Sequence, residues 1–198
     1  MPNRFVERRI TPPPGASPES ASCWMTGPFG NLRVTPLIRA CAEGDLSTVT
    51  KELSGLSRAE LWRVLSDTDD WAGSTALHWA AYAGSAPIVV ALLRADADPE
   101  SRNTRDEALP LHLAARYNQS SEALEELVRA APGTMNAVNS RGNTPLHETA
   151  YEGRVASASK LLSFGPHART DAHSFFLRAR PAHWPPPLTM CVPPPRRR

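Results

Sequence analysis

The sequence has few of the residues that disulfide-bonded folds and phosphate-binding loops depend on. Only three of its 198 residues are cysteine, and they lie far apart at Cys23, Cys41 and Cys191. This sparse, odd count argues against a disulfide framework and favours a reducing compartment. Lysine occurs only at Lys51 and Lys160, and neither follows a glycine-rich loop that could cradle phosphate. We therefore expect neither a secreted disulfide-rich protein nor a P-loop enzyme.

Long apolar runs and a strong excess of one charge are also missing. No eighteen consecutive residues are apolar, and the N-terminal arginines are not followed by the apolar run of a secretory signal. The formal net charge is +2, which gives no electrostatic footprint for nucleic acid, and the three arginines at 196–198 are too few to supply one. We expect an intracellular protein, most simply cytoplasmic although a nuclear location stays open, with no nucleic-acid or membrane partner.

Proline is plentiful but unevenly placed. The twenty prolines concentrate near the two ends, whereas the middle of the chain is rich in alanine and leucine. Proline-rich segments with few apolar side chains cannot bury a core. The composition therefore predicts a disordered Pro/Ser-rich tail at 1–30, a folded centre at 31–165 and a disordered Pro/Arg-rich tail at 166–198.

One short motif recurs through the folded centre. It reads STALHWAA at 74–81, LPLHLAA at 109–115 and TPLHETA at 144–150, and a degenerate copy, TPLIRAC, occupies 35–41. Aligned copies begin at positions 35, 75, 109 and 144, so the steps are 40, 34 and 35 residues. A period near this length, together with this recurring motif, indicates an array of helical repeats.

The motif and its period resemble those of the ankyrin repeat family. The resemblance implies an all-α, ankyrin-repeat solenoid of about four helix-turn-helix repeats, at about 31–66, 70–99, 104–136 and 139–165. The pattern fails after residue 165, so the array is expected to stop without a polar cap, as it would in a fragment or in a gene model with a wrong last exon.

Local signals place the helices within each repeat. The recurring motif predicts first helices at 36–43, 76–83, 110–117 and 145–152, the earliest with Thr35 as its cap and Pro36 as its first residue. The apolar spacing predicts second helices at 46–53, 87–94, 121–130 and 155–163. The longest step contains Ser57 and Glu60, a capping box that predicts an extra helix at 58–66 whose apolar residues pack on the stack. In the third repeat Glu107 replaces the turn glycine, and Asn118 is expected to take the left-handed conformation of the glycine between the helices.

The recurring histidines could suggest a metal site. Stacked helices lie about 10 Å apart, whereas zinc ligands lie about 2 Å from one ion, so His78, His112 and His147 cannot share a metal. The resemblance instead implies that each histidine bonds to neighbouring backbone and ties adjacent repeats together. Cys41 stands at a small, buried helix position that favours packing over nucleophilic chemistry. We expect no metal, no cofactor and no enzyme activity.

Function is then expected to reside on the surface. In ankyrin proteins the concave face, built from turn tips and first helices, is the usual recognition surface, so the resemblance implies a non-catalytic module or adaptor, monomeric, that binds another protein. The alternative is a regulatory ankyrin segment of a larger enzyme or channel. Tyrosine, tryptophan and arginine, which dominate interface hot spots, gather at the matching positions. The candidate protein-binding residues are Trp71, Ser74, Tyr82, Arg105, Asp106, Arg116, Tyr117, Arg141, Asn143, Tyr151 and Glu152.

Overall fold

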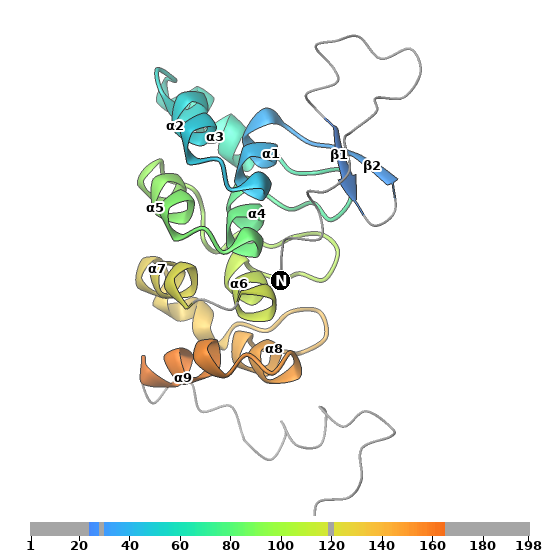
Figure 1. Ribbon diagram of the computed structural model, residues 1–198, viewed down its shortest axis with the longest axis vertical. Helices are drawn as coiled ribbons and strands as arrows, with labels where there is room; N and C mark the ends of the chain where they lie inside the picture. The colour runs from blue at the N-terminus through green and yellow to red at the C-terminus, as the bar shows by residue number, and fades with distance from the viewer. Residues whose placement is uncertain (1–23, 28–29, 119–120, 165–198) are drawn as a thin grey trace, which may run out of the picture.

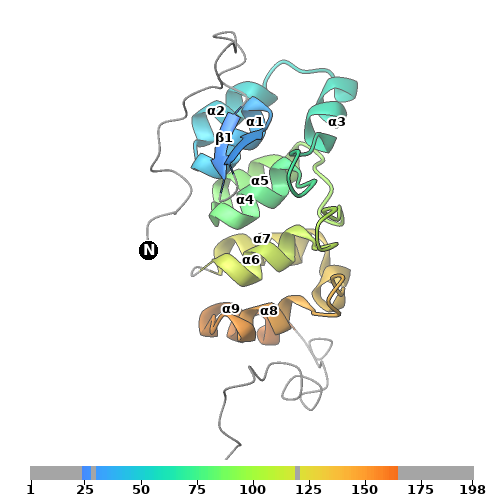
Figure 2. The same cartoon turned by 90° about the vertical axis from the view of Figure 1, so that its right-hand side faces the viewer.

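The computed structural model describes residues 24–27, 30–118 and 121–164, and the two predicted tails lie almost entirely outside these residues. In the described part, helices α1, α4, α6 and α8 form one column and α2, α5, α7 and α9 form a second column beside it (Figure 1). Figure 2 shows the same helices as successive layers, with α3 beside the first two. We call α1, α4, α6 and α8 the inner helices, and the surface that they form with the loops preceding them the inner face.

The helix boundaries agree with those expected from the sequence to within one residue. The inner helices are α1 (Pro36–Glu43), α4 (Ala76–Ala83), α6 (Pro110–Tyr117) and α8 (Pro145–Tyr151). The outer helices are α2 (Leu46–Leu53), α5 (Ala86–Arg94), α7 (Glu122–Ala130) and α9 (Val155–Ser163). The added helix α3 spans Arg58–Ser66, and a short 3-10 helix, η2, spans Pro132–Asn136. The prediction of an all-α repeat fold is confirmed.

The core runs between the two columns and through all layers. Leu77 and Leu111 of the inner helices and Leu92 and Leu127 of the outer helices are at most 1% exposed. Full burial of such a side chain contributes about 1.5–3 kcal/mol, which exceeds a typical cap or surface ion pair. Helices of seven to nine residues are marginal alone in water, so their stability comes from this stacking. Small side chains let the helices approach closely, and four of them are fully buried: Ala80, Ala81, Ala114 and Ala115.

A β-hairpin precedes α1. Strand β1 (Trp24–Gly27) pairs antiparallel with β2 (Gly30–Arg33), and the hairpin stands on the side of the stack where loops precede the later inner helices (Figure 1). This differs from the sequence analysis, which assigned residues 24–27 to the tail. Four-residue strands that pair through their backbone leave little pattern in the sequence, and the nearby prolines dominated the composition.

Asn118 does not take the expected left-handed conformation. Its φ is −89° and its ψ is 137°, which is extended backbone. Its side-chain Nδ2 instead donates to the carbonyl of Ala81 in the preceding repeat, at 2.6 Å. The asparagine therefore links α4 to α6, a long-range role that the alignment with glycine could not indicate.

Helix α3 forms where the capping box predicts it. The Ser57 amide donates to Glu60 Oε2 at 2.8 Å, and Ser57 Oγ accepts from the Glu60 amide at 3.4 Å. Leu65 is buried and Val64 packs against the core, but Trp62 is 70% exposed. The expectation that all apolar residues of α3 pack on the stack is therefore wrong for Trp62, because a short helix can turn only one side toward its neighbours.

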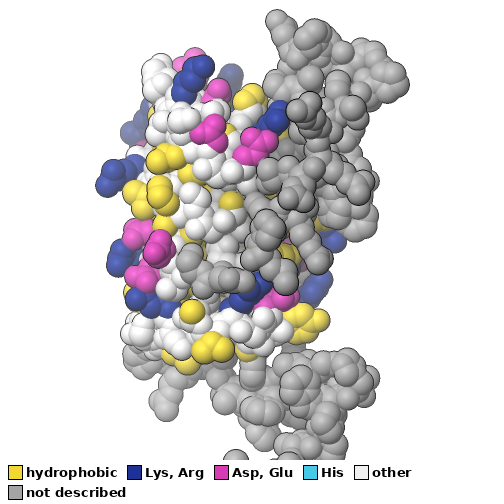
Figure 3. All heavy atoms as spheres, in the orientation of Figure 1, with side chains coloured by type: hydrophobic (Ala, Val, Ile, Leu, Met, Phe, Trp, Pro, Cys, Tyr) yellow, Lys and Arg dark blue, Asp and Glu magenta, His cyan; other side chains and the backbone are white. Residues whose placement is uncertain are grey.

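The end of the described stack presents apolar side chains. Val155 and Leu162 of α9 are 75% and 57% exposed, whereas Val128, the last large apolar residue of α7, is 2% exposed. Figure 3 shows hydrophobic side chains at this end and a mixture of charges over the outer helices. The outer side of α9 thus presents apolar surface, and the expectation that the array stops without a polar cap stays a prediction.

Replacing Glu107 by glycine is expected to raise the free energy of unfolding by about 0.5–1 kcal/mol. Glu107 has a φ of +50°, in the left-handed region, whereas Gly73 at the matching position of the second repeat has +60°. A side chain with a Cβ is strained there, and glycine is not. Urea denaturation measures the change. Glu107→Ala is the matched control because it removes the carboxylate but keeps the Cβ; an equal gain in this variant would show that charge, not backbone strain, is responsible.

Candidate protein-binding face

One polar side chain organises each loop that precedes α4, α6 and α8. Asp69 Oδ1 accepts the amides of Trp71 and Ala72 at 2.8 and 2.6 Å. Asn103 Oδ1 accepts the amide of Ala108 at 2.9 Å, and Asn139 Oδ1 accepts the amides of two residues of its own loop, both at 3.0 Å. These internal bonds fix the loops that edge the inner face.

The three loop-organising residues were missed as a set from the sequence. Asp69, Asn103 and Asn139 each lie five or six residues before the cap of an inner helix. A polar residue recurring at that offset is a signal that alignment of the loops, as well as of the helices, could have found.

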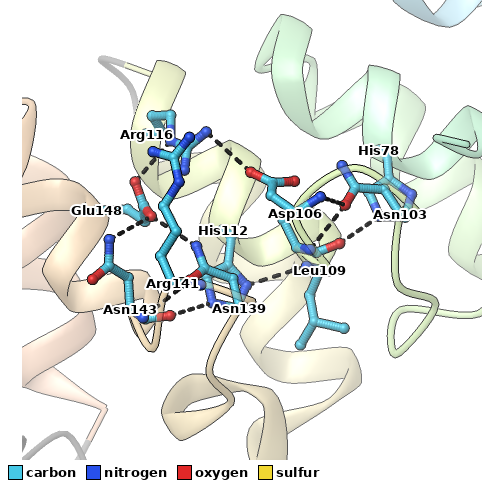
Figure 4. A network of polar contacts seen from close by, with 11 residues as sticks. His78, Asn103, Asp106, Leu109, His112, Arg116, Asn139, Arg141, Asn143 and Glu148 are labelled. Atoms are coloured by element: carbon cyan, nitrogen blue, oxygen red, sulfur yellow. Dashed lines mark hydrogen bonds and ion pairs between the residues drawn. The ribbon is translucent and has the colours of Figure 1, made fainter. Parts of the chain in front are cut away.

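The histidines link each loop to the next repeat. His78 Nδ1 accepts the Thr75 amide at 3.2 Å, and its Nε2 lies 3.0 Å from the carbonyl of Ala108. His112 repeats the arrangement, with Nε2 3.0 Å from the carbonyl of Asn143 (Figure 4). Because Nδ1 accepts, Nε2 carries the proton and donates. The expectation that the histidines tie adjacent repeats together is confirmed for His78 and His112. His147 Nδ1 accepts the Thr144 amide at 3.2 Å, and a link from His147 to a following repeat stays a prediction.

Burial keeps both histidines neutral. It lowers the pKa of His78 to about 4, and the bond to the Ala108 carbonyl opposes this shift only in part. Burial likewise lowers the pKa of His112. Both ring nitrogens of each residue are used in hydrogen bonds, so these side chains serve the stack and not a shared ligand.

A second polar cluster joins α6, α8 and the loop before α6. Arg116 Nε donates to Glu148 Oε2 at 2.7 Å, and Arg116 Nη1 lies 3.4 Å from Asp106 Oδ2. Glu148 Oε1 also accepts Nδ2 of Asn139 and of Asn143, at 2.9 and 3.2 Å. Figure 4 shows the side chains converging on this point. We call Asp106, Arg116, Asn139, Asn143 and Glu148 the Arg116 cluster.

Both partners in the ion pair are held charged although they are largely buried. The side chains of Arg116 and Glu148 are 12% and 2% exposed. Burial alone would raise the pKa of Glu148, but the hydrogen bond and charge of Arg116, with the two asparagine bonds, lower it overall. Burial would lower the pKa of Arg116, and the bond and charge of Glu148 outweigh that effect. The two groups thus depend on each other for their ionised state.

Glu148 was not singled out from the sequence, yet it is a centre of this cluster. The matching position holds Trp79 in α4, whose Nε1 donates to Asp69 Oδ2 at 2.9 Å. In both repeats the residue after the histidine reaches back to the loop-organising side chain, but donor and acceptor have exchanged roles. Leu113 of α6 cannot make such a bond.

Aromatic rings and guanidinium groups extend along the inner face. The Tyr82 ring contacts the rings of Trp79 and Tyr117 edge to face, at centroid distances of 5.7 and 4.7 Å. At the loop tips the Arg105 guanidinium lies 4.1 Å from the centroid of the Trp71 ring. Side chains of adjacent repeats therefore form continuous surface.

The residues expected to bind a partner separate into three groups by burial. Ser74 and Asp106 are buried, Arg116 is nearly so, and Asn143 is engaged in the cluster, so these four first of all build the stack. Trp71 and Tyr82 are half-buried. The remaining candidates expose substantial surface on the inner face or its edge: Arg105, Tyr117, Arg141, Tyr151 and Glu152.

Cys41 has the properties of a packing residue. It is fully buried in α1, and burial raises the pKa of its thiol to about 12. A thiol that is protonated and inaccessible at neutral pH is not a competent nucleophile.

The layers of paired helices, linked from loop to loop by histidines, define a repeat solenoid. A family model described as ankyrin repeats, in three copies, matches residues 19–103 and 91–174. The chain therefore belongs to the ankyrin repeat family. The matched region is wider than the 31–165 indicated by the motif alone, and it continues past the last residue of α9.

Family membership gives the general character of the protein. Ankyrin repeats are generally protein–protein interaction modules and typically non-catalytic. Among the helices of the described residues, none combines the length and apolar character needed to cross a membrane.

Proposed function

We propose that the protein is a non-catalytic adaptor that binds a partner protein on its inner face. The observation that carries this proposal is the row of residues placed four positions after each histidine: Tyr82 on α4, Arg116 on α6 and Tyr151 on α8. Tyr117 adds a ring in contact with Tyr82. Tyrosine and arginine are the residue types that contribute most to protein interfaces.

Exposure supports the same interpretation. Tyr117 is 42% exposed and Tyr151 is 70% exposed, so much of each ring remains available after the stack has formed. These rings have few rotatable bonds and therefore lose little entropy when a partner covers them. The loops beneath are held by the internal bonds of Asp69, Asn103 and Asn139, so the surface is organised before binding.

Tyr117→Ala combined with Tyr151→Ala is expected to weaken partner capture at least tenfold, while the melting temperature changes by only a few degrees. The measurement is affinity purification from cell extract with the full chain, followed by quantification of retained proteins and thermal unfolding of each variant. Both tyrosines are exposed, so the loss is one of binding surface.

The matched control is Trp62→Ala. Trp62 is also 70% exposed and aromatic, but it lies on α3, which is not part of the inner face. This variant is expected to retain the same proteins as the wild type. If the double tyrosine variant captures them equally well, or if only Trp62→Ala loses them, the inner face is not the binding surface.

A further inference from the structure

Arg116 is incompletely satisfied within its cluster. Its Nε and Nη1 contact Glu148 and Asp106, but its Nη2 is buried and has no hydrogen-bond partner in the part of the chain that the structure describes. Buried donors in folded proteins are nearly always paired, so each exception asks for an acceptor. The row of Tyr82, Arg116 and Tyr151 places this donor at the centre of the inner face.

The charge of the cluster indicates what kind of acceptor fits. Arg116 contributes one positive charge, whereas Glu148 and Asp106 contribute two negative charges at 2.7 and 3.4 Å from it. His112, whose pKa is lowered by burial, adds no positive charge at neutral pH. A further carboxylate would join two carboxylates already beside Arg116, and like charges repel strongly where the dielectric is low. An uncharged oxygen meets the donor without that penalty.

The neighbouring rings indicate where such an oxygen would enter. The guanidinium Cζ of Arg116 lies 5.8 Å from the centroid of the Tyr117 ring, and Tyr117 is itself 42% exposed. An exposed side chain changes rotamer readily, so Tyr117 can turn from Arg116 toward an incoming segment without disturbing the core. The hydrogen bond of Tyr117 to Arg116 is given up in this movement, and the incoming oxygen replaces it as an acceptor for the guanidinium.

We propose that Arg116 anchors the bound partner and that its Nη2 receives an uncharged main-chain carbonyl oxygen from an extended, non-acidic peptide segment. This inference rests on the proposed function and names the chemistry of its partner. Helices and sheets use their own carbonyls internally, whereas an extended segment outside a sheet presents them unpaired. The rings of Tyr117 and Tyr82 then contact the side chains that flank this carbonyl.

The test uses random twelve-residue peptides displayed on phage and selected on the full-length protein. Enriched peptides are synthesised, and their dissociation constants are measured for the wild type and for Arg116→Lys. Lysine keeps the positive charge beside Glu148 and Asp106 but has no Nη2, and circular dichroism melting confirms that the variant is folded. Each peptide is then made with one backbone amide at a time replaced by an ester, which weakens that carbonyl as an acceptor.

The enriched peptides are expected to lack acidic residues at the contact position, and Arg116→Lys is expected to weaken binding about tenfold, or 1.4 kcal/mol. One ester position should weaken binding to the wild type and have no effect on binding to Arg116→Lys. Such a coupling would show that the peptide carbonyl accepts a hydrogen bond from the Nη2 that lysine lacks.

Other outcomes overturn the inference. If binding depends on an Asp or Glu of the peptide and is abolished when Asn or Gln replaces that residue, Arg116 binds a carboxylate and not a main-chain carbonyl. If Arg116→Lys binds as tightly as the wild type while the double variant Tyr117→Ala, Tyr151→Ala loses binding, the inner face is functional but Arg116 is not its anchor. If neither variant loses the peptides, the proposed function fails together with the inference.

Discussion

Arg116→Met is expected to lower the free energy of unfolding at pH 7 by about 3–5 kcal/mol. The substitution preserves most of the side-chain volume but leaves Glu148, 2% exposed, with a negative charge and no cation beside it. Two asparagine amides still donate to Glu148, but neutral donors do not replace the ion pair. Urea denaturation followed by circular dichroism measures the change.

The control for this variant is Arg129→Met. Arg129 also pairs with two carboxylates, those of Glu125 and Glu126, but its side chain is 60% exposed on α7. Solvent screens such a pair, so its removal is expected to cost less than about 1 kcal/mol. An equal cost for the two substitutions would show that burial of the Arg116 cluster is not what makes it important.

Lowering the pH is expected to reduce the difference in free energy of unfolding between Arg116→Met and the wild type. In the wild type the pKa of Glu148 lies below its ordinary value of 4.5, so its contribution is present above pH 4.5 and is lost as pH falls through the lower, folded pKa. Without Arg116, burial is opposed only by the two asparagine bonds, so the folded pKa of Glu148 rises. The destabilisation then exists above that raised pKa and disappears below it. If this difference in free energy of unfolding stays constant from pH 7 to pH 4, the charge of Glu148 is not the cause of the destabilisation.

The fold was largely predictable because its signals are local. Pro36, Pro110 and Pro145 each stand at the first position of a helix, where the missing amide is not needed. Ser57 and Glu60 lie three residues apart and form the capping box that begins α3. Each of these helix-start signals involves residues of a single turn, so it can be recognised from the sequence alone.

The Arg116 cluster was not predictable in the same way. Arg116 and Glu148 are 32 residues apart, and nothing near either residue indicates that they meet. The position of Arg116 in its repeat predicts a surface location. The position is the one expected, but stacking of α8 on α6 brings Glu148 against it and buries both. Asn118 is the same case, because its partner is the Ala81 carbonyl of another repeat.

Lowering the pH from 7 to 5 is expected to reduce the free energy of unfolding, with His78 alone contributing about 2 kcal/mol. The folded pKa of His78 is about 4, below the ordinary histidine value of 6.5, because the ring is buried. The unfolded chain therefore takes up a proton as pH falls below 6.5, while the folded protein does not until about pH 4. His112, whose pKa is also lowered, acts in the same direction.

His78→Gln isolates the contribution of this one histidine. Glutamine does not titrate, and its amide has both an acceptor and a donor for the Thr75 amide and the Ala108 carbonyl. The loss of stability between pH 7 and pH 5 should shrink by about 2 kcal/mol in this variant, whatever its stability at pH 7. The lowered pKa of Glu148 confines its own effect to more acid solutions, below about pH 4.5. If the variant keeps the full loss, His78 is not held neutral in the folded stack. The hydrogen bond to the Ala108 carbonyl would then be made by a positively charged His78 ring.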